Sequence, residues 1–137
     1  MKKVLFFLVA VLAFTLTACG GGAAAPAYSN KIDVTLNEFM FAPTDFTIPA
    51  GQEITLNATN EGKVAHEFVI IKLGQEVTVP FDADDEDKVF WEKEVEPGKT
   101  ETVTFTAPTE PGEYTLVCGI SGHLEAGMTA KLVVVAP

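Results

Sequence analysis

Short segments of alternating hydrophobic and polar residues run through the chain from residue 30 to its end. Over residues 53–58 every second residue is apolar, and over 100–106 Val103 and Phe105 alternate with threonines. An alternation of period two is typical of a strand with one buried face. Eight segments are predicted as strands on this basis, at 31–36, 45–48, 53–58, 66–72, 89–94, 100–106, 113–118 and 128–135.

Proline, glycine and asparagine separate these segments, as at Pro97-Gly98 and Pro111-Gly112. Such residues punctuate strands with turns. No stretch of this region has the apolar period of a long amphipathic helix. We therefore predict one all-β domain over residues 30–137, a two-sheet Greek-key β-sandwich of seven to eight antiparallel strands.

The first residues have a different character. A basic start at Lys2 and Lys3 is followed by an apolar run over 4–16, shorter than the roughly 20 residues that span a bilayer as a helix. The run ends in Leu16-Thr-Ala-Cys19, which resembles the lipobox of bacterial lipoproteins. We predict a lipoprotein signal peptide at 1–18, then a lipidated Cys19 and a flexible tether over 19–29. The domain is then exported and lipid-anchored to a bacterial membrane, facing the periplasm or the cell exterior; an ordinary signal peptide is the alternative.

The chain of 137 residues carries a formal net charge of −10 and contains no arginine. This charge argues against nucleic acid as a partner. Eight of the sixteen residues over 81–96 are acidic. A calcium loop starting at Asp82 fails, because Asp87 stands where the turn needs glycine and Lys93 where the bidentate glutamate belongs. The segment is interpreted as a solvated surface loop, with recognition of a basic partner as the alternative.

Candidate metal chemistry lies near the C-terminus. Cys118, His123 and Met128 are spaced C-x4-H-x4-M between two predicted strands. If Cys19 is lipidated, Cys118 is the one remaining thiol. His66, in the strand over 66–72, is either a core residue or a fourth ligand. Two histidines, one cysteine and a weak axial methionine are the ligands of a blue-copper electron-transfer site.

Residues 30–137 resemble the cupredoxin family, which includes plastocyanin, azurin and auracyanin, and the x4-x4 spacing is most similar to that of auracyanins. The resemblance implies one copper ion, with His66 as the early ligand, Cys118 as the thiolate, His123 as the ligand near the surface and Met128 as the axial thioether. Many members have asparagine after the first histidine; this chain has Glu67 there. Met40 has no place in the motif and is expected in core or rim packing.

The resemblance also implies a function. A full set of four ligands leaves no open position for a substrate, so we expect a monomeric one-electron carrier between redox partners rather than an enzyme. The edge of the His123 ring is expected to be exposed in an apolar patch with Ile120 and Leu124, and the acidic surface suits a basic partner such as a cytochrome. Two alternatives remain. One is periplasmic copper binding for storage, resistance or delivery; the other is a copper-free immunoglobulin-like adhesion domain, which explains the strands but not the ligand spacing.

Overall fold

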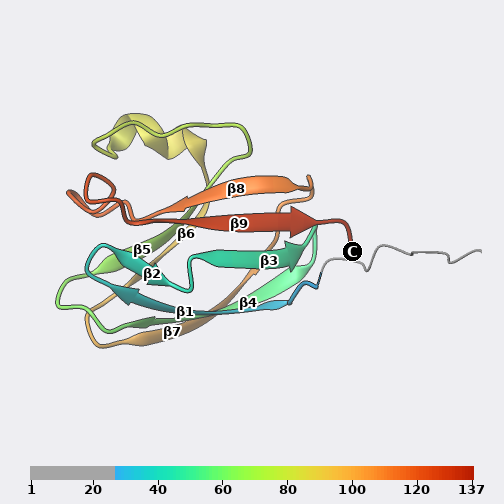
Figure 1. The fold of residues 1–137 in the computed structure, drawn as a ribbon, viewed down its shortest axis with the longest axis horizontal. Helices are drawn as coiled ribbons and strands as arrows, with labels where there is room; N and C mark the ends of the chain where they lie inside the picture. The colour runs from blue at the N-terminus through green and yellow to red at the C-terminus, as the bar shows by residue number, and fades with distance from the viewer. Residues whose placement is uncertain (1–26) are drawn as a thin grey trace, which may run out of the picture.

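The computed structural model describes residues 27–137, which form two β-sheets packed face to face (Figure 1). One sheet has the strand order β2-β1-β4-β7 and the other β3-β9-β8-β5-β6. The predicted all-β sandwich is confirmed. The elements are β1 (Lys31–Asn37), β2 (Met40–Ala42), β3 (Asp45–Pro49), β4 (Glu53–Asn60), β5 (His66–Ile71), the 3-10 helix η1 (Ala83–Lys88), β6 (Val89–Val95), β7 (Thr100–Thr106), β8 (Gly112–Val117) and β9 (Thr129–Val135).

Two details of the prediction are wrong. Residues 27–137 contain nine strands rather than seven or eight, because β2 is only three residues long and too short to show an alternation. The strands are also not all antiparallel, since β1 pairs parallel with β4 and β3 pairs parallel with β9. Between β1 and β4 the chain crosses to the other sheet to form β3, and it returns in the direction in which β1 runs.

The main core lies between the sheets. Strand β4 shows how the alternation builds it, since Ile54, Leu56 and Ala58 are fully buried while the residues between them are partly exposed. Aromatic rings fill the centre, where Phe68 lies edge-on to Phe41 and Phe46 at centroid distances of 6.1 and 6.0 Å. Edge-to-face aromatic contacts of this kind stabilise the fold by more than the burial of their apolar surface alone.

A second apolar cluster covers the outer face of the five-stranded sheet. Val69, Ile71 and Val117 are buried there, and partly buried residues of the β5–β6 connection, of β6 and of the 119–128 loop pack on them. The connection carries η1 and folds back over the sheet (Figure 1). Strand β5 is therefore buried on both faces over much of its length, which explains why its sequence is a nearly continuous apolar run.

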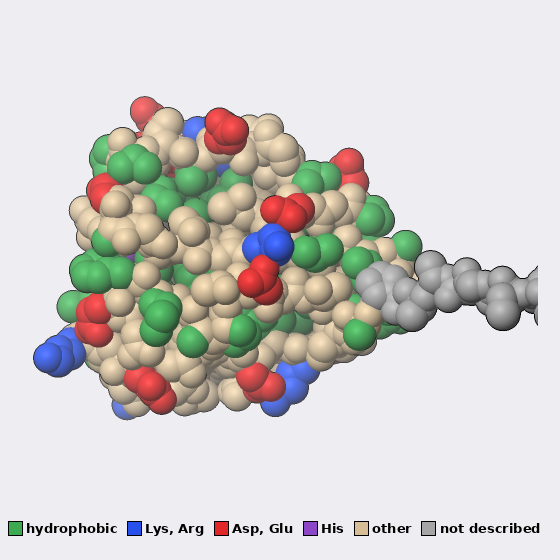
Figure 2. All heavy atoms as spheres, in the orientation of Figure 1, with side chains coloured by type: hydrophobic (Ala, Val, Ile, Leu, Met, Phe, Trp, Pro, Cys, Tyr) green, Lys and Arg blue, Asp and Glu red, His purple; other side chains and the backbone are tan. Residues whose placement is uncertain are grey.

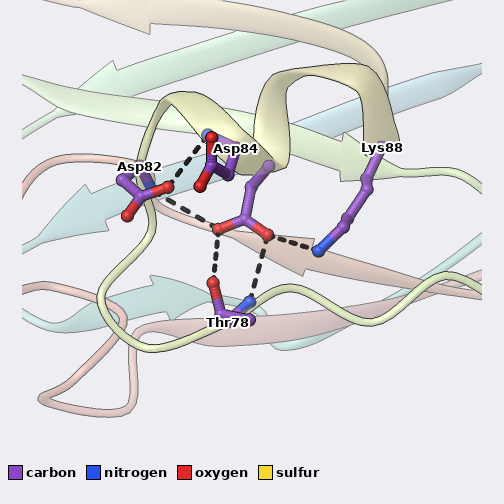
Figure 3. Close-up of polar contacts among 5 residues, drawn as sticks. Thr78, Asp82, Asp84 and Lys88 are labelled. Carbon is purple, nitrogen blue, oxygen red and sulfur yellow. Dashed lines mark hydrogen bonds and ion pairs between the residues drawn. The ribbon is translucent and has the colours of Figure 1, made fainter.

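The expectation that 81–96 is simply a solvated loop is therefore wrong in part. Asp85, in η1, is fully buried and accepts hydrogen bonds from the backbone N–H and hydroxyl of Thr78, at 3.1 and 3.0 Å (Figure 3). The Lys88 ammonium donates to the same carboxylate at 2.7 Å. These donors, led by Lys88, lower the pKa of Asp85 to about 2. One acidic side chain of this segment thus fastens the connection, while most of the others face solvent.

The predicted signal peptide over 1–18 and Cys19 lie outside the described residues, as does most of the predicted tether. At the start of the described part, the Ser29 backbone N–H donates to the Thr47 carbonyl at 3.0 Å, so the chain is fastened to β3 just before β1 begins. Within residues 27–137, no helix has the length and apolar character needed to cross a membrane.

Candidate metal centre

The candidate ligands meet at one end of the sandwich because of how β5 and β8 pair. These strands are antiparallel, with Val69 opposite Val117, so the start of β5 lies beside the end of β8. His66 is the first residue of β5, and Cys118 directly follows β8. The loop 119–128, drawn at the left end of Figure 1, then carries His123 back over the same end before β9 begins.

Three of the four predicted ligands converge on a common point. Cys118 Sγ lies 3.3 Å from His123 Nδ1 and 3.9 Å from His66 Nδ1. The ligand atoms of the three residues all lie within 4.8 Å of one another, and all three side chains are buried. Segments 52 residues apart in the sequence therefore place a thiol and two imidazole nitrogens around one small volume.

Backbone hydrogen bonds hold Met128 at the base of this loop. The Cys118 N–H donates to the Met128 carbonyl at 3.2 Å, and the Met128 N–H donates to the His123 carbonyl at 2.9 Å. The Met128 side chain is fully buried in the main core. Gly127, with φ of +89°, supplies the left-handed conformation that turns the chain directly before Met128.

The spacing of the donors fits a bound metal ion. Metal bonds of about 2.0 Å to nitrogen and 2.3 Å to sulfur, opened to about 120°, separate the two ligand atoms by about 3.7 Å. The two sulfur–nitrogen distances of 3.3 and 3.9 Å lie on either side of that value. Thiolate, imidazole and thioether donors together favour copper over calcium or magnesium.

Burial controls the protonation of the donors. It lowers the pKa of His66, with a smaller contribution from His123, and it raises the pKa of the Cys118 thiol. Both shifts favour the neutral side chain when no cation is present. A copper ion reverses this preference at sulfur, because metal binding requires the thiolate.

The surroundings of His66 and Cys118 are tightly packed. A Cβ atom at Gly62 would lie 2.6 Å from His66 Nε2, so only glycine fits beside that ring. Nε2 is itself buried without a hydrogen-bond partner within the described residues. On the other side, the Glu67 backbone N–H donates to Cys118 Sγ at 3.4 Å. The His66 ring thus packs close to Gly62, and the thiol accepts a hydrogen bond from the backbone of the residue that follows His66.

The expected exposure of His123 is not observed. The residue is only 6% exposed, and Ile120 and Leu124 are half-buried against the two apolar clusters. Phe39 covers the ring instead, edge-on at a centroid distance of 5.4 Å. The sequence offered no signal for this contact, because it depends on a φ of +64° that is unusual for a bulky residue.

The apolar surface at this end comes from the β1–β2 turn, the start of β2 and the β4–β5 connection. Phe39, Met40 and Val64 are 51%, 49% and 45% exposed. The expectation of rim packing for Met40 agrees with this exposure. Figure 2 shows hydrophobic side chains across this face of the molecule, including the end that carries the 119–128 loop, where little histidine surface is visible.

The half-buried Glu67 lies next to the ligands. Burial raises the pKa of its carboxyl group, and the negative charges of Glu92, Glu94 and Glu86 act in the same direction. The Gly119 backbone N–H opposes this rise in pKa, because it favours the ionised carboxylate. The carboxyl group therefore lies beside Gly119, the residue that follows Cys118.

Comparisons with known proteins agree with this geometry. A model of the cupredoxin-like domain family matches residues 6–134. Auracyanin-A of Chloroflexus aurantiacus is 27% identical over 98% of this chain and 97% of its own length, and the copper-resistant cuproprotein CopI of Rubrivivax gelatinosus is 29% identical over 82% of this chain and 70% of its own. The reduced auracyanin of Roseiflexus castenholzii superimposes with a TM-score of 0.68 at 29% identity, covering 80% of this chain and 99% of that one.

The family match spans nearly the whole chain, and the fold and the clustered donors are independent of it. The sandwich brings together two histidines and a cysteine from separate strands and loops, with a buried methionine at the base of the same loop. The protein therefore belongs to the cupredoxin family, with the His-Cys-His-Met donor set of a type 1 copper site.

Proposed function

We propose that this protein is a one-electron carrier that holds a single copper ion through His66, Cys118, His123 and Met128. The observation that carries the proposal is the convergence of the two Nδ1 atoms on Cys118 Sγ, at 3.3 and 3.9 Å, in a site that the sheets build. His66 Nδ1, Cys118 Sγ and His123 Nδ1 are the main donors in this proposal, and Met128 is the weak axial one.

The packing supports electron transfer rather than catalysis. Copper in such a site supplies a one-electron couple between Cu(II) and Cu(I). The four donors are buried and come from a strand and a loop fixed by backbone hydrogen bonds, so they move little when the charge at the centre changes. The four residues also fill the coordination positions, which leaves none open for a substrate.

Electron exchange with a partner is proposed to take place at the end of the molecule where Phe39 covers His123. Acidic side chains on η1 and β6, which include Glu86, Glu92 and Glu94, are exposed on the same molecule. These charges favour a basic partner such as a cytochrome, whose association rate would fall as salt screens the attraction. An association rate independent of salt would contradict this part of the proposal.

Export and membrane attachment complete the proposal. The basic start, the apolar run over 4–16 and the Leu16-Thr-Ala-Cys19 sequence support cleavage before Cys19 and lipidation of its thiol. Mass spectrometry of the mature N-terminus, with Cys19→Ala as the control, tests this. An unmodified N-terminus in the wild-type protein would contradict it.

The copper site is tested by titration of the domain starting at residue 20 with Cu(II), followed by visible absorption and electron paramagnetic resonance. We expect an intense thiolate-to-copper band at one equivalent, bleached by reductant and restored by oxidant. Cys118→Ser is the matched control and should lack the band, because an alcohol oxygen replaces the thiolate sulfur. No band in the wild-type domain would contradict the proposal.

The similarity to CopI favours a second candidate, copper storage, resistance or delivery. The same donors would serve it, so the two functions differ in whether the metal is retained. A carrier keeps its copper through repeated reduction and oxidation in the presence of a Cu(I) chelator. Loss of Cu(I) to the chelator within a few cycles would favour copper handling.

A further inference from the structure

Glu67 makes contacts that neither the ligand set nor the fold requires. It directly follows His66, and the alternation of β5 turns its side chain away from the core. Its backbone N–H donates to Cys118 Sγ at 3.4 Å. The backbone of β5 is therefore hydrogen-bonded to the sulfur of the residue that follows β8.

The carboxylate of the same residue reaches Gly119. A Cβ atom at Gly119 would lie 2.4 Å from Glu67 Oε2 and 3.0 Å from the Phe81 ring. The Glu67 carboxylate therefore occupies the space that a side chain at position 119 would need. The Gly119 backbone N–H lies close enough to this carboxyl group to lower its pKa, against the effect of burial. Glu67 thus contacts Cys118 through its backbone and Gly119 through its side chain.

The position of this carboxylate has an electrostatic consequence. It is half-buried and contacts the residue adjacent to the thiolate ligand, where the effective dielectric constant is lower than in water. A negative charge beside the proposed copper site stabilises the more positive of the two oxidation states of the ion. It therefore favours Cu(II) over Cu(I).

On the basis of the proposed copper site, we propose that Glu67 is a positioning residue that fastens the Cys118 segment to β5 and lowers the reduction potential of the bound copper through its negative charge. The two effects are separable. Glutamine keeps an oxygen beside Gly119 but removes the charge, whereas alanine removes both.

The test of the charge is the reduction potential of the copper-loaded domain at pH 8 in Glu67→Gln. The Cu(I)/Cu(II) ratio at a fixed applied potential should rise about tenfold, equivalent to about 59 mV for one electron. Glu94→Gln is the matched control, because Glu94 lies opposite Glu67 across β5 and β6 but is exposed. Its ratio should change by less than about twofold. Equal changes in the two variants would overturn the electrostatic part of the proposal.

The fastening is tested without copper. In the metal-free domain, Glu67→Gln should unfold in urea near the wild-type midpoint, whereas Glu67→Ala should unfold at a lower urea concentration, with Trp91 fluorescence as the signal. With copper, Glu67→Ala should also shift the thiolate-to-copper band, because the Cys118 segment is less constrained. A wild-type midpoint and an unshifted band in Glu67→Ala would overturn the positioning role. Absence of the band in the wild-type domain would instead be a failure of the proposed copper site, and the metal-free midpoints would still test the fastening.

Discussion

Phe39 lies edge-on against His123, with ring centroids 5.4 Å apart and an interplanar angle of 81°. The contact is made by a residue whose φ is +64°, in the turn between β1 and β2. A left-handed conformation of a residue with a Cβ costs about 1–2 kcal/mol. The fold therefore accepts a strained turn that covers the more exposed of the two histidine ligands.

The strain at Phe39 predicts an unusual order of stability between two variants. Phe39→Gly should be more stable to unfolding than Phe39→Ala by about 1 kcal/mol, because both lose the ring but only glycine adopts a positive φ without strain. Urea denaturation of the metal-free domain measures the difference. At the neighbouring Met40, in β2, the order should reverse, since glycine weakens a strand. Equal stability of Phe39→Gly and Phe39→Ala would show that the turn is not strained.

Gly62 should be needed for copper binding more than for folding. A Cβ atom there would meet His66 Nε2 at 2.6 Å, so Gly62→Ala should displace the imidazole from its present position beside Cys118. We expect copper affinity to fall by about 10–100-fold, as measured by competition with a chelator of known affinity. Gly112→Ala is the matched control, because its Cβ would meet Leu73 at 2.8 Å, away from the ligands. It should cost stability but leave affinity unchanged; an unchanged affinity in Gly62→Ala would show that the ring has room to adjust.

Asp85 predicts loss of stability in acid. Its folded-state pKa of about 2 is below the ordinary value of 3.8, so its contribution is present in full above about pH 4 and is lost as the pH falls toward 2. Asp85→Asn should lower the free energy of unfolding at pH 7 and flatten its dependence on pH between 4 and 2. Urea unfolding at a series of pH values measures both effects. Asp84→Asn, which removes an exposed charge from the same helix, should retain the wild-type slope.

Phe68 should be among the residues on which the sandwich most depends. It is fully buried and makes edge contacts with Phe41, Phe46 and Trp91. Phe68→Ala should reduce the free energy of unfolding by about 3–5 kcal/mol, through lost burial and the cavity left behind. Phe90→Ala, at a ring that is 39% exposed, should cost about 1 kcal/mol or less. Thermal unfolding of the two variants compares them, and equal losses would contradict the assignment of Phe68 to the centre of the core.

The packing of the β5–β6 connection on the outer face of β5 could not be predicted from the sequence. The acidic composition of 81–96 indicated a solvated loop, and most of its acidic side chains are indeed exposed. Composition could not distinguish Asp85, whose burial depends on Thr78 and Lys88 closing around its carboxylate. The apolar run of β5 was compatible with one buried face or two, and only the folded connection decides between them.

The sandwich can be predicted from local patterns, since period-two alternation and turn residues specify strands. The metal chemistry is also visible in the sequence, because Cys118, His123 and Met128 lie close together in the chain. The pairing of β5 with β8 is what brings His66 to them in space, and the crossing of the chain between the sheets is what makes β1 and β4 run parallel. The folded loops also place Phe39 over His123, whose ring edge the resemblance implies to be exposed in a patch with Ile120 and Leu124, and they bring Glu67 to Gly119. These contacts join residues distant in the chain, and strand register and loop conformation fix them in ways that no local pattern records.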